Sequence, residues 1–352
     1  MSRRTLIVSY DYKPEIGGQG VYVQNLERYV HNKALLVANG EPSENVFVKK
    51  TFFMKGLGPI IFSKRLACSL NKYVRKANAD VVHFQSGPGG VFLLKKPRAK
   101  LFATVHSTFL LSAKHKKGLL SPYYKVMQFL ERRSLKMCDH IIAISRLVKD
   151  EIVSGYKIDE RKISVLHIPV EDYFQPVNVQ KENIILFVGR LEKQKGILEL
   201  LEAFRMVCRK HPEYSLEIAG EGSLSKKIRK IIRQNNLEGR IRILGPIKHQ
   251  ELPRLYSRAA LTVMPSLFEP YGLTAIESIS CGTPCLVPEK SGAAEIIEKI
   301  DKNLIIKKVS PDEIANAIEK NLGKRIYIDN KKISLKDWKT YAREFERIRD
   351  EL

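Results

Sequence analysis

Short apolar runs recur along this chain, and stretches with helical spacing of apolar residues separate them. The runs are continuous and rich in valine and isoleucine, which is typical of parallel strands covered on both faces. The runs that we assign to strands are Thr5–Ser9, Leu35–Val37, Asp80–Phe84, Leu101–Val105, His140–Ile144, Ile163–Leu166, Asn183–Val188, Ser215–Ala219, Ile241–Leu244, Leu261–Met264, Cys285–Pro288 and Leu304–Ile306. Strands that alternate with helices predict an α/β fold.

The length of the chain bears on the number of domains. Its 352 residues suffice for two domains of ordinary size. The strands form two similar series, so we place an N-terminal domain at 1–173, a C-terminal domain at 174–333 and a last helix at 334–352, which we expect to cross back to the N-terminal domain. Two such modules predict a ligand-binding cleft between domains.

Positive charge is concentrated in the first half of the chain. Lysine and arginine outnumber aspartate and glutamate by 61 to 38, and the window 49–149 alone holds 21 basic and three acidic residues. Such a surface attracts polyanions, namely phospholipid head groups, acidic substrates or nucleic acid. General solubility or heat adaptation explains the total charge but not its concentration. Within this window, 125–136 has the composition of a membrane-surface helix. The commoner reason for such a composition is a core helix with a basic solvent-facing side.

Composition also bears on location and on metal binding. No apolar run approaches the ~20 residues that span a bilayer, and the apolar core that follows Met1–Arg4 is too short for a signal peptide. The five cysteines are odd in number and mostly scattered, as in a reduced protein. Cys281 and Cys285 have no second ligand pair nearby, so we expect no metal site there. We expect a cytoplasmic protein, with attachment to the inner face of the membrane as a further expectation.

One loop and the helix that follows it carry a distinctive chemical pattern. A turn-rich loop after an apolar run contains Glu269, and Glu277 lies about one turn into the next helical pattern. Gly272 lets the backbone come close to a ligand, and the N–H groups of Leu273 and Thr274 open the helix, where an anion is favoured. The stretch predicts a phosphate cradle with two carboxylates for sugar hydroxyls. The alternative is an ordinary connection with two surface glutamates.

Two further loops follow predicted strands and have residues suited to a ligand. Arg190 and Lys195 suit a diphosphate, because arginine is a planar fork and lysine a point charge; the alternative is two surface cations. Gly17 and Gly18 precede a helix, and His106 directly follows a strand, at the carboxyl end where open α/β sheets bind ligands. A tight turn and a structural histidine are the alternatives here.

In this order and spacing, the motifs resemble the retaining glycosyltransferases of the GT-B fold, in their large family four. The match extends over roughly 110 residues of the second half and is looser in the first half. The matching residues are Phe187–Leu191 with Lys195 and Gly196, Ile218–Gly222, Leu244 and Gly245, Pro265 and Ser266 with Glu269, Gly272 and Glu277, Cys281–Pro284, Gly292 with Glu295, and in the first half Gly17, Gly18, His106 and Asp139–Ser145. The resemblance implies two Rossmann-like α/β domains that face each other across a cleft.

The resemblance also implies roles for the matching positions. Arg190 and Lys195 would neutralise the diphosphate of the sugar donor, and Glu269 and His106 would contact its sugar; these four are the candidate catalytic residues. The candidate substrate-binding residues are Gly17, Gly18, Gly220, Gly272, Leu273, Thr274 and Glu277, the last for ribose hydroxyls. Because two cations and a helix N-terminus offset the diphosphate charge, we expect no divalent metal and no cofactor.

The resulting hypothesis is a retaining, metal-independent transferase that moves a hexose from a UDP- or GDP-sugar to an acceptor hydroxyl. Retention is implied by the family resemblance alone. The basic window favours a lipid, a lipid-linked sugar or an anionic glycan as acceptor, bound by the N-terminal domain at an anionic membrane surface; nucleic acid is less favoured. The alternatives are a glycogen-type synthase or a nucleotide-sugar epimerase on the same fold, and an inactive scaffold that holds anionic lipid or nucleic acid.

Overall fold

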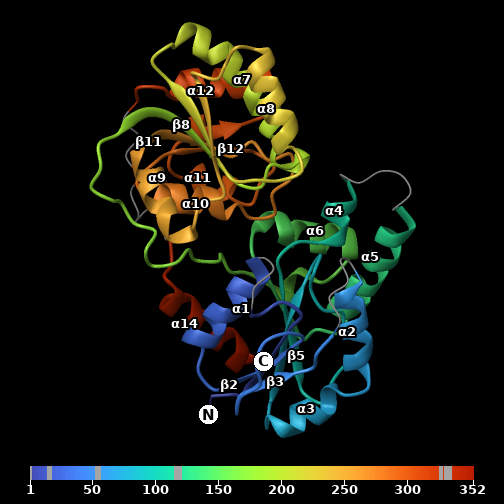
Figure 1. Ribbon diagram of the computed structural model, residues 1–352. Coiled ribbons are helices and arrows are strands. Elements are labelled where there is room, and N and C mark those ends of the chain that lie inside the picture. The colour runs from blue at the N-terminus through green and yellow to red at the C-terminus, as the bar shows by residue number, and fades with distance from the viewer. Residues whose placement is uncertain (1, 14–17, 52–56, 115–120, 325–327, 329–334) are drawn as a thin grey trace. The chain divides into compact units, whose positions relative to one another are not determined.

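A computed structural model describes the whole chain except residues 1, 14–17, 52–56, 115–120, 325–327 and 329–334. The chain divides into two compact units, which are described one at a time (Figure 1). Unit 1 comprises Met1–Pro169 and Lys336–Leu352, and unit 2 comprises Val170–Leu335. Each unit is built on one parallel sheet covered by helices, so the predicted α/β fold is confirmed.

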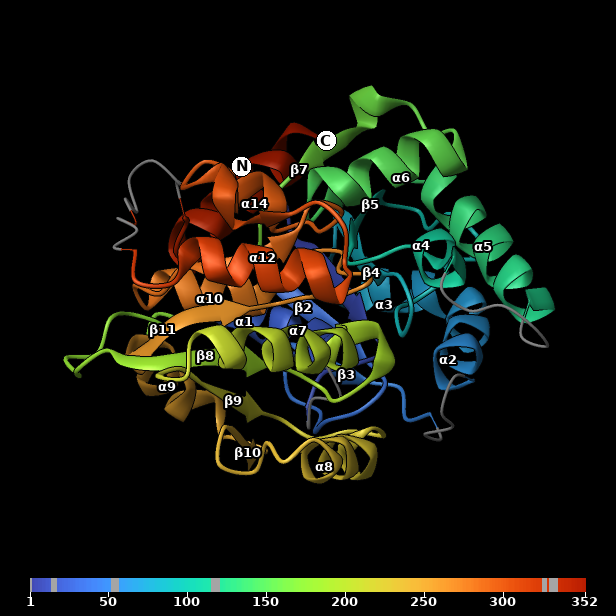
Figure 2. The ribbon, with the colours of Figure 1, turned by 90° about the horizontal axis from the view of Figure 1, so that it is seen from above.

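The sheet of unit 1 has seven strands in the order β3-β2-β1-β4-β5-β6-β7. These strands are β1 (Thr5–Ser9), β2 (Lys33–Val37), β3 (Val46–Val48), β4 (Val81–Ser86), β5 (Lys100–Val105), β6 (His140–Ala143) and β7 (Ile163–Val165). The helices are α1 (Gly18–Tyr29), α2 (Gly58–Ala67), α3 (Leu70–Lys76), α4 (Phe109–Lys114), α5 (Ser121–Lys136), α6 (Arg146–Tyr156) and α14 (Trp338–Glu351), with a short 3-10 turn η1 (Glu160–Lys162). Figures 1 and 2 show α1 and α14 on one flank and α2 and α5 on the other.

Helix α14 belongs to unit 1 although it ends the chain. Its first turn is capped by Asp337, whose carboxylate accepts a hydrogen bond from a backbone N–H of that turn. The hydroxyl of Tyr341 lies 2.8 Å from that of Tyr22 on α1, and the ring of Phe345 packs on Phe102 of β5. Buried residues at helical spacing therefore hold the helix against α1 and the sheet.

The sheet of unit 2 has six strands in the order β10-β9-β8-β11-β12-β13. These strands are β8 (Glu182–Val188), β9 (Ser215–Ala219), β10 (Ile241–Gly245), β11 (Ala259–Val263), β12 (Cys285–Pro288) and β13 (Ile305–Ile306). The helices are α7 (Ile197–Lys210), α8 (Ser225–Gln234), α9 (Leu252–Arg258), α10 (Leu273–Ser280), α11 (Ala294–Ile297) and α12 (Pro311–Asn321), with 3-10 turns η2 (Lys193–Lys195), η3 (His249–Glu251) and η4 (Lys302–Leu304).

The loops that carry the candidate residues leave the carboxyl ends of parallel strands. His106 follows β5 and Gly18 begins α1 in unit 1. In unit 2, the loops after β8, β9 and β11, with the start of α10, carry the other described candidates. Because all strands of a parallel sheet point the same way, the loops of one unit emerge at one edge of its sheet. Across the described residues, every helix falls short of the length and apolar character that crossing a bilayer requires.

Candidate active site

The loop from β8 to α7 packs against the loops that follow β9 and β11. The N–H of Leu191 donates to the carbonyl oxygen of Glu221 at 2.9 Å, and the Leu191 side chain is fully buried. At the end of the loop, Gly196 has a φ of 66°, and a Cβ there would lie only 1.9 Å from the carbonyl oxygen of Pro265. Only glycine fits at this close approach, so the approach fixes the position of the neighbouring Lys195.

Lys195 and Glu269 form an ion pair between these two loops. The Nζ atom of Lys195 lies 2.5 Å from Oε2 of Glu269, across 74 positions of sequence, and the Ser266 hydroxyl donates to the same oxygen at 3.2 Å. The lysine side chain is 22% exposed and the carboxylate 13%. The structure thus brings together two of the predicted catalytic residues, and both remain within reach of a ligand.

Arg190 lies in the same loop as Lys195 and is exposed. Among the residues that the structure describes, no carboxylate forms an ion pair with its guanidinium group. The two predicted cations therefore share one loop, but a contact with Glu269 is seen only for Lys195.

Helix α10 begins after a glycine in the left-handed region. Gly272 has a φ of 100°, and a Cβ there would lie 2.9 Å from Cε of Met264. The first N–H groups of a helix have no intrahelical acceptor, so those of Leu273 and Thr274 form the positive end of α10. Both residues are half-buried. Their place at the helix start agrees with the sequence, while the binding of an anion there stays a prediction.

Glu277 is buried in α10 and has protein partners for both oxygens. Oε2 accepts a hydrogen bond from the Tyr256 hydroxyl at 2.7 Å, and Oε1 lies 3.3 Å from Nε2 of His249. The hydrogen bond to this carboxylate raises the pKa of His249, whose Nδ1 lies 2.6 Å from the Tyr173 hydroxyl. His249 and Tyr173 were not predicted from the sequence, because neither belongs to a motif. A ribose would have to share Glu277 with these groups.

Gly220 has a structural reason to be glycine. Its φ is 134°, and a Cβ would lie 2.0 Å from the carbonyl oxygen of Gly189. Its own N–H donates to the carbonyl oxygen of Gly245 at 2.7 Å. The ends of three neighbouring strands therefore meet at this residue, and a role in binding the substrate stays a prediction.

In unit 1, His106 lies at the carboxyl end of β5. Its Nε2 is 2.9 Å from Oε1 of Gln85, and its ring meets that of Tyr22 edge to face with 4.8 Å between centroids. Burial lowers the pKa of His106 to about 3, so the imidazole is neutral near pH 7. Of the two predicted glycines, Gly18 is the first residue of α1, and a Cβ there would meet no atom within 4 Å; Gly17 lies outside the described residues.

A buried chain of polar side chains leads from Gln85 to α14. Nε2 of Gln85 lies 3.4 Å from Nδ1 of His83, and Nε2 of His83 lies 2.9 Å from the Thr104 hydroxyl. That hydroxyl lies 3.1 Å from the hydroxyl of Tyr22, which contacts Tyr341. This chain of polar side chains was not predicted from the sequence. One pattern in the sequence could have revealed it. His83 and Gln85 are polar residues two positions apart in an apolar strand, so they lie on the same face of the sheet.

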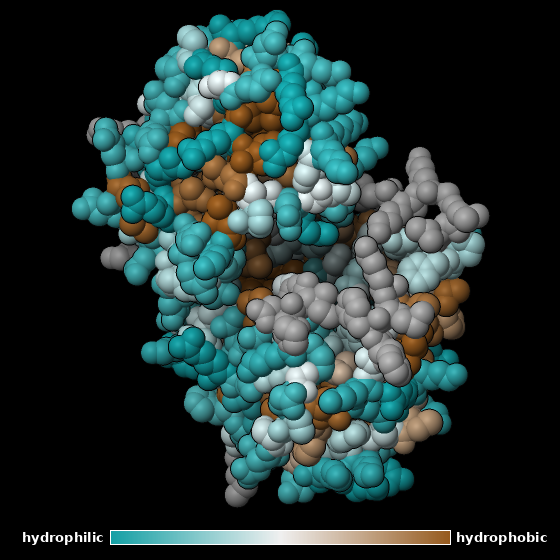
Figure 3. Space-filling view, in the orientation of Figure 1, coloured by the Kyte–Doolittle hydropathy of each residue, from teal (hydrophilic) through white to brown (hydrophobic). Residues whose placement is uncertain are grey.

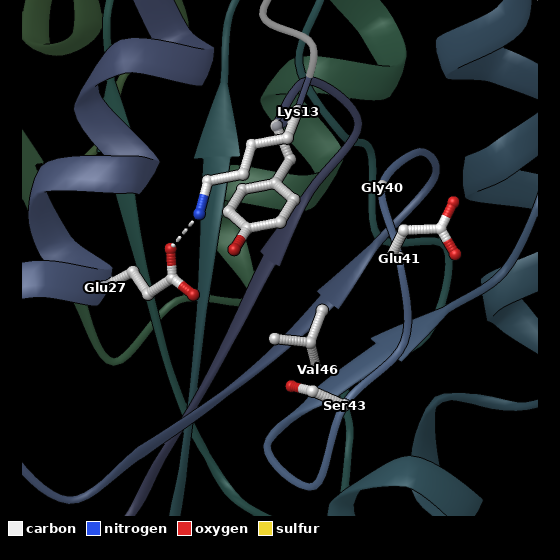
Figure 4. Close-up of a pocket in the computed structure, with 7 residues that line it drawn as sticks. Lys13, Glu27, Gly40, Glu41, Ser43 and Val46 are labelled. Atoms are coloured by element: carbon white, nitrogen blue, oxygen red, sulfur yellow. Dashed lines mark hydrogen bonds and ion pairs between the residues drawn. The ribbon is translucent and has the colours of Figure 1, made fainter.

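An open hollow of about 520 Å³ lies beside the ends of β1 and β2 in unit 1. Lys13 donates to Glu27 at 2.9 Å, and the Glu41 side chain points away from this pair (Figure 4). The hollow is lined by Tyr12, Lys13, Glu27, Gly40, Glu41, Ser43 and Val46. A cation, two carboxylates and two hydroxyl groups can hydrogen-bond a ligand rich in hydroxyl groups. In the described parts of both units, no three His, Cys, Asp or Glu side chains gather as a metal site would require.

Two family descriptions match the chain, one on each half. Residues 170–345 match "Glycosyl transferases group 1", and residues 16–172 match "Glycosyltransferase Family 4". Among curated proteins, the chain is 29% identical over 60% of its length to an uncharacterized glycosyltransferase of Methanocaldococcus jannaschii. Over 56% of its length it is 27% identical to a glycogen synthase of Mycobacterium tuberculosis and 30% identical to the O-antigen chain mannosyltransferase RfbU of Salmonella typhimurium. The matches cover 59%, 48% and 58% of these relatives, so the chain spans about half of each.

Solved structures resemble the whole chain in fold. A sucrose-phosphate synthase from Thermosynechococcus elongatus matches with a TM-score of 0.79 and 19% identity, over 99% of both chains. Anabaena HepE, in complex with UDP and glucose, matches with a TM-score of 0.74 and 16% identity, over 99% of this chain and all of the other. At such identities the likeness concerns the fold. Together with the family matches, it shows that the chain belongs to the group 1 glycosyltransferases of the GT-B fold.

Proposed function

We propose that this glycosyltransferase moves a hexose from a UDP- or GDP-sugar to an acceptor hydroxyl, with retention of configuration and without a divalent metal. The observation that carries the proposal is the ion pair of Lys195 and Glu269, 2.5 Å long, which joins the loop before α7 to the loop before α10. An ammonium group suits a diphosphate, and a carboxylate beside it suits the hydroxyls of the attached sugar. Unit 2 is therefore proposed to bind the donor.

The proposed chemistry depends on charge that develops on the diphosphate. As the bond between sugar C1 and the phosphate oxygen breaks, negative charge grows on the leaving nucleotide. Lys195, Arg190 and the N–H groups at the start of α10 would stabilise that charge, which is why we propose no metal. The acceptor oxygen would bond to C1 from the face that the nucleotide leaves, and the proton of the acceptor would pass to the departing diphosphate. This course retains the configuration at C1.

The remaining candidate residues are assigned supporting roles. Glu277 would accept hydrogen bonds from ribose, and the neutral imidazole of His106 would hydrogen-bond the donor sugar. Gly18, with Gly17 before it, would let the backbone approach the donor, because a glycine leaves the space of a side chain open.

The relatives suggest which donors to test first. HepE was solved with UDP and glucose, and RfbU is named a mannosyltransferase. UDP-glucose and GDP-mannose are therefore the first two donors to test. A glycogen-type synthase is the second candidate function, because a glycogen synthase is among the relatives of the chain.

The acceptor is proposed to bind unit 1 and to be a lipid, a lipid-linked sugar or an anionic glycan. The excess of cations in 49–149 favours an anionic surface, and the hollow beside β1 and β2 offers polar groups for a hydroxyl-rich head group. We propose that the protein acts at the cytoplasmic face of a membrane.

The decisive experiment is a thermal-shift panel with UDP, GDP, ADP and their sugar conjugates, all with EDTA present. A shift for one nucleotide that disappears in Arg190→Ala/Lys195→Ala supports the donor site and narrows the sugar. Product analysis with that donor then separates a transferase from a nucleotide-sugar epimerase, which needs no acceptor. The absence of a shift with every nucleotide would favour an inactive scaffold instead.

A further inference from the structure

Helices α2 and α5 are held side by side by one segment of unit 1. The N–H of Phe92 donates to the Ser63 hydroxyl of α2, and the N–H of Leu93 donates to the Ser134 hydroxyl of α5, both at 2.8 Å. Both serines are buried, so the two helices turn their buried faces to this segment and their opposite faces to solvent. Figures 1 and 2 both show the helices on the same flank.

The solvent face of α5 mixes apolar and cationic side chains. Phe129 is 63% exposed and Val126 is 53% exposed. Four exposed cations lie three, four or seven residues from Phe129, so they share one side of the helix with it. These cations are Lys125, Arg132, Arg133 and Lys136. The one acidic residue of α5, Glu131, is buried on the other side.

Helix α2 repeats this composition. Leu57, just before the helix, and Ile61 are exposed apolar side chains. Lys64 and Arg65 are exposed one turn further on, at positions that share the same side. Figure 3 shows hydrophobic atoms at the edge of the unit where Figure 1 places α5 and α2. We call the exposed residues of the two helices the α2–α5 face.

Among the described residues, no ion pair joins a cation of the α2–α5 face to an acid. Of the three acids in the basic window, Asp80 accepts a hydrogen bond from the N–H of Arg4, and Asp139 forms an ion pair with Lys96. The third, Glu131, accepts hydrogen bonds from inside the unit. The cations of the α2–α5 face therefore remain available to an anionic partner.

Helix α8 of unit 2 shows that cations alone do not make such a face. Its exposed positions are polar, and about two turns of the helix carry exposed cations at Lys226, Lys227, Arg229, Lys230 and Arg233. The apolar side chains of α8, by contrast, are buried or half-buried. A purely electrostatic partner would be attracted by α8 as well, whereas apolar side chains interleaved with cations occur on α5 and α2.

We propose that the α2–α5 face docks on an anionic lipid bilayer. Phe129, Val126, Leu57 and Ile61 would enter the boundary between head groups and acyl chains, while the cations lie level with the lipid phosphates. The proposal rests on the proposed function only for the idea that the acceptor lies in a membrane. Docking is measured without donor or acceptor, so either idea can fail alone.

The first test places a fluorescent probe on the face. The natural Trp338 is buried in unit 1, so it supplies a constant background. Phe129→Trp is expected to shift its emission to shorter wavelength when vesicles of equal parts phosphatidylcholine and phosphatidylglycerol are added, and not with phosphatidylcholine alone. An unchanged emission with both vesicles would overturn the proposal.

The second test compares matched pairs of substitutions by vesicle flotation. Lys125→Ser/Lys136→Ser is expected to weaken binding to the anionic vesicles on the order of 20-fold, about fivefold for each cation. Lys226→Ser/Lys230→Ser on α8 makes the same charge change. We expect its vesicle binding to stay within about twofold of the wild type, because the bilayer contacts the α2–α5 face and not α8. Equal losses in the two double variants would mean a diffuse charge effect and would reject the α2–α5 face.

The apolar side chains separate a bilayer from nucleic acid. Phe129→Ser/Val126→Ser is expected to reduce vesicle binding several-fold with no change in charge; both side chains are exposed, so the fold is spared. Binding of duplex DNA at the same salt concentration serves as the comparison. If the cation variants lose DNA binding and the apolar variant loses nothing on vesicles, the face binds polyanions and the bilayer proposal is wrong.

Discussion

The side chain of Gln85 bonds to His106 through its amide oxygen, with 2.9 Å between Oε1 and Nε2. Its amide nitrogen lies 3.4 Å from Nδ1 of His83, a ring whose other nitrogen meets Thr104. An amide oxygen can only accept, so Nε2 of His106 carries the hydrogen, and Nδ1 of this neutral ring is left as an acceptor. Gln85 thereby selects the tautomer of the imidazole that we propose to contact the donor sugar.

Replacing this amide by a carboxylate is expected to introduce a pH dependence. In Gln85→Glu a negative charge faces His106, which raises its pKa from the low value that burial imposes. Protonation would then remove the acceptor at Nδ1, so kcat/KM is expected to fall as pH drops through the raised pKa, while the wild type shows no such step. Nitrogen NMR of the ring reports the tautomer independently of activity; an unchanged tautomer in Gln85→Leu would contradict the assignment.

The ion pair of Lys195 and Glu269 predicts which cation of its loop matters for catalysis. Lys195→Ala is expected to lower kcat about 10²–10³-fold, because an electrostatic contact to the leaving diphosphate is lost. Lys193→Ala removes an exposed cation two residues away and is expected to change kcat less than twofold. Steady-state kinetics with the donor identified by thermal shift compares the two variants. Equal losses of kcat in the two variants would mean that the loop acts through its total positive charge and not through the contact of Lys195.

The close approach at Gly196 predicts a large cost in stability for a single methyl group. In Gly196→Ala the new Cβ would meet the Pro265 carbonyl oxygen, and the backbone would hold a left-handed φ of 66°. We expect a loss of about 2–4 kcal/mol, the sum of conformational strain and steric overlap. Gly239→Ala is the control, because a Cβ there meets nothing within 4 Å. Denaturant unfolding of both variants measures the difference, and similar values would refute the packing argument.

The buried carboxyl of Glu131 predicts how stability depends on pH. Burial raises the pKa of Glu131 to about 7, from an ordinary value of 4.5. The folded state therefore binds the proton more tightly, and the contribution to stability is complete below about pH 4.5 and is lost as pH rises through about 7. The shift corresponds to roughly 3 kcal/mol. Glu131→Gln is expected to remove this dependence, which urea unfolding at pH 5 and pH 8 tests; an unchanged slope would exclude Glu131 as its source.

Strands such as β1 and β12 were predictable because their apolar runs are continuous and fully buried. Helix α10 likewise begins at Leu273, where the sequence predicted a helix. Strand β3 was missed, since Val46–Val48 has three residues and only Val46 is buried. Such a short, half-covered edge strand depends on pairing with β2 and leaves little periodicity to read.

The candidate site was predictable only as a set of residue types. The sequence singled out Lys195 and Glu269, but their contact depends on how two loops pack across 74 positions. The partners of Glu277 could not be read from the sequence either, because Tyr256 and His249 reach it from separate elements. The local sequence shows which residues follow the end of a strand, whereas tertiary packing determines which of their side chains are in contact.

The partners of Glu277 lead to a test of its proposed contact with ribose. Glu277→Gln keeps the size of the side chain but weakens its acceptor oxygens, and we expect UDP, if it is the donor nucleotide, to bind about 10-fold more weakly. A UDP analogue without the 2′ and 3′ hydroxyls has nothing to donate, so its affinity is expected to be the same for both proteins. Tyr256→Phe is the control, because it removes the hydrogen bond of 2.7 Å to Glu277 and keeps the carboxylate. Isothermal titration gives the affinities; if the analogue loses affinity as much as UDP does, Glu277 supports the fold of the site and does not contact the ribose.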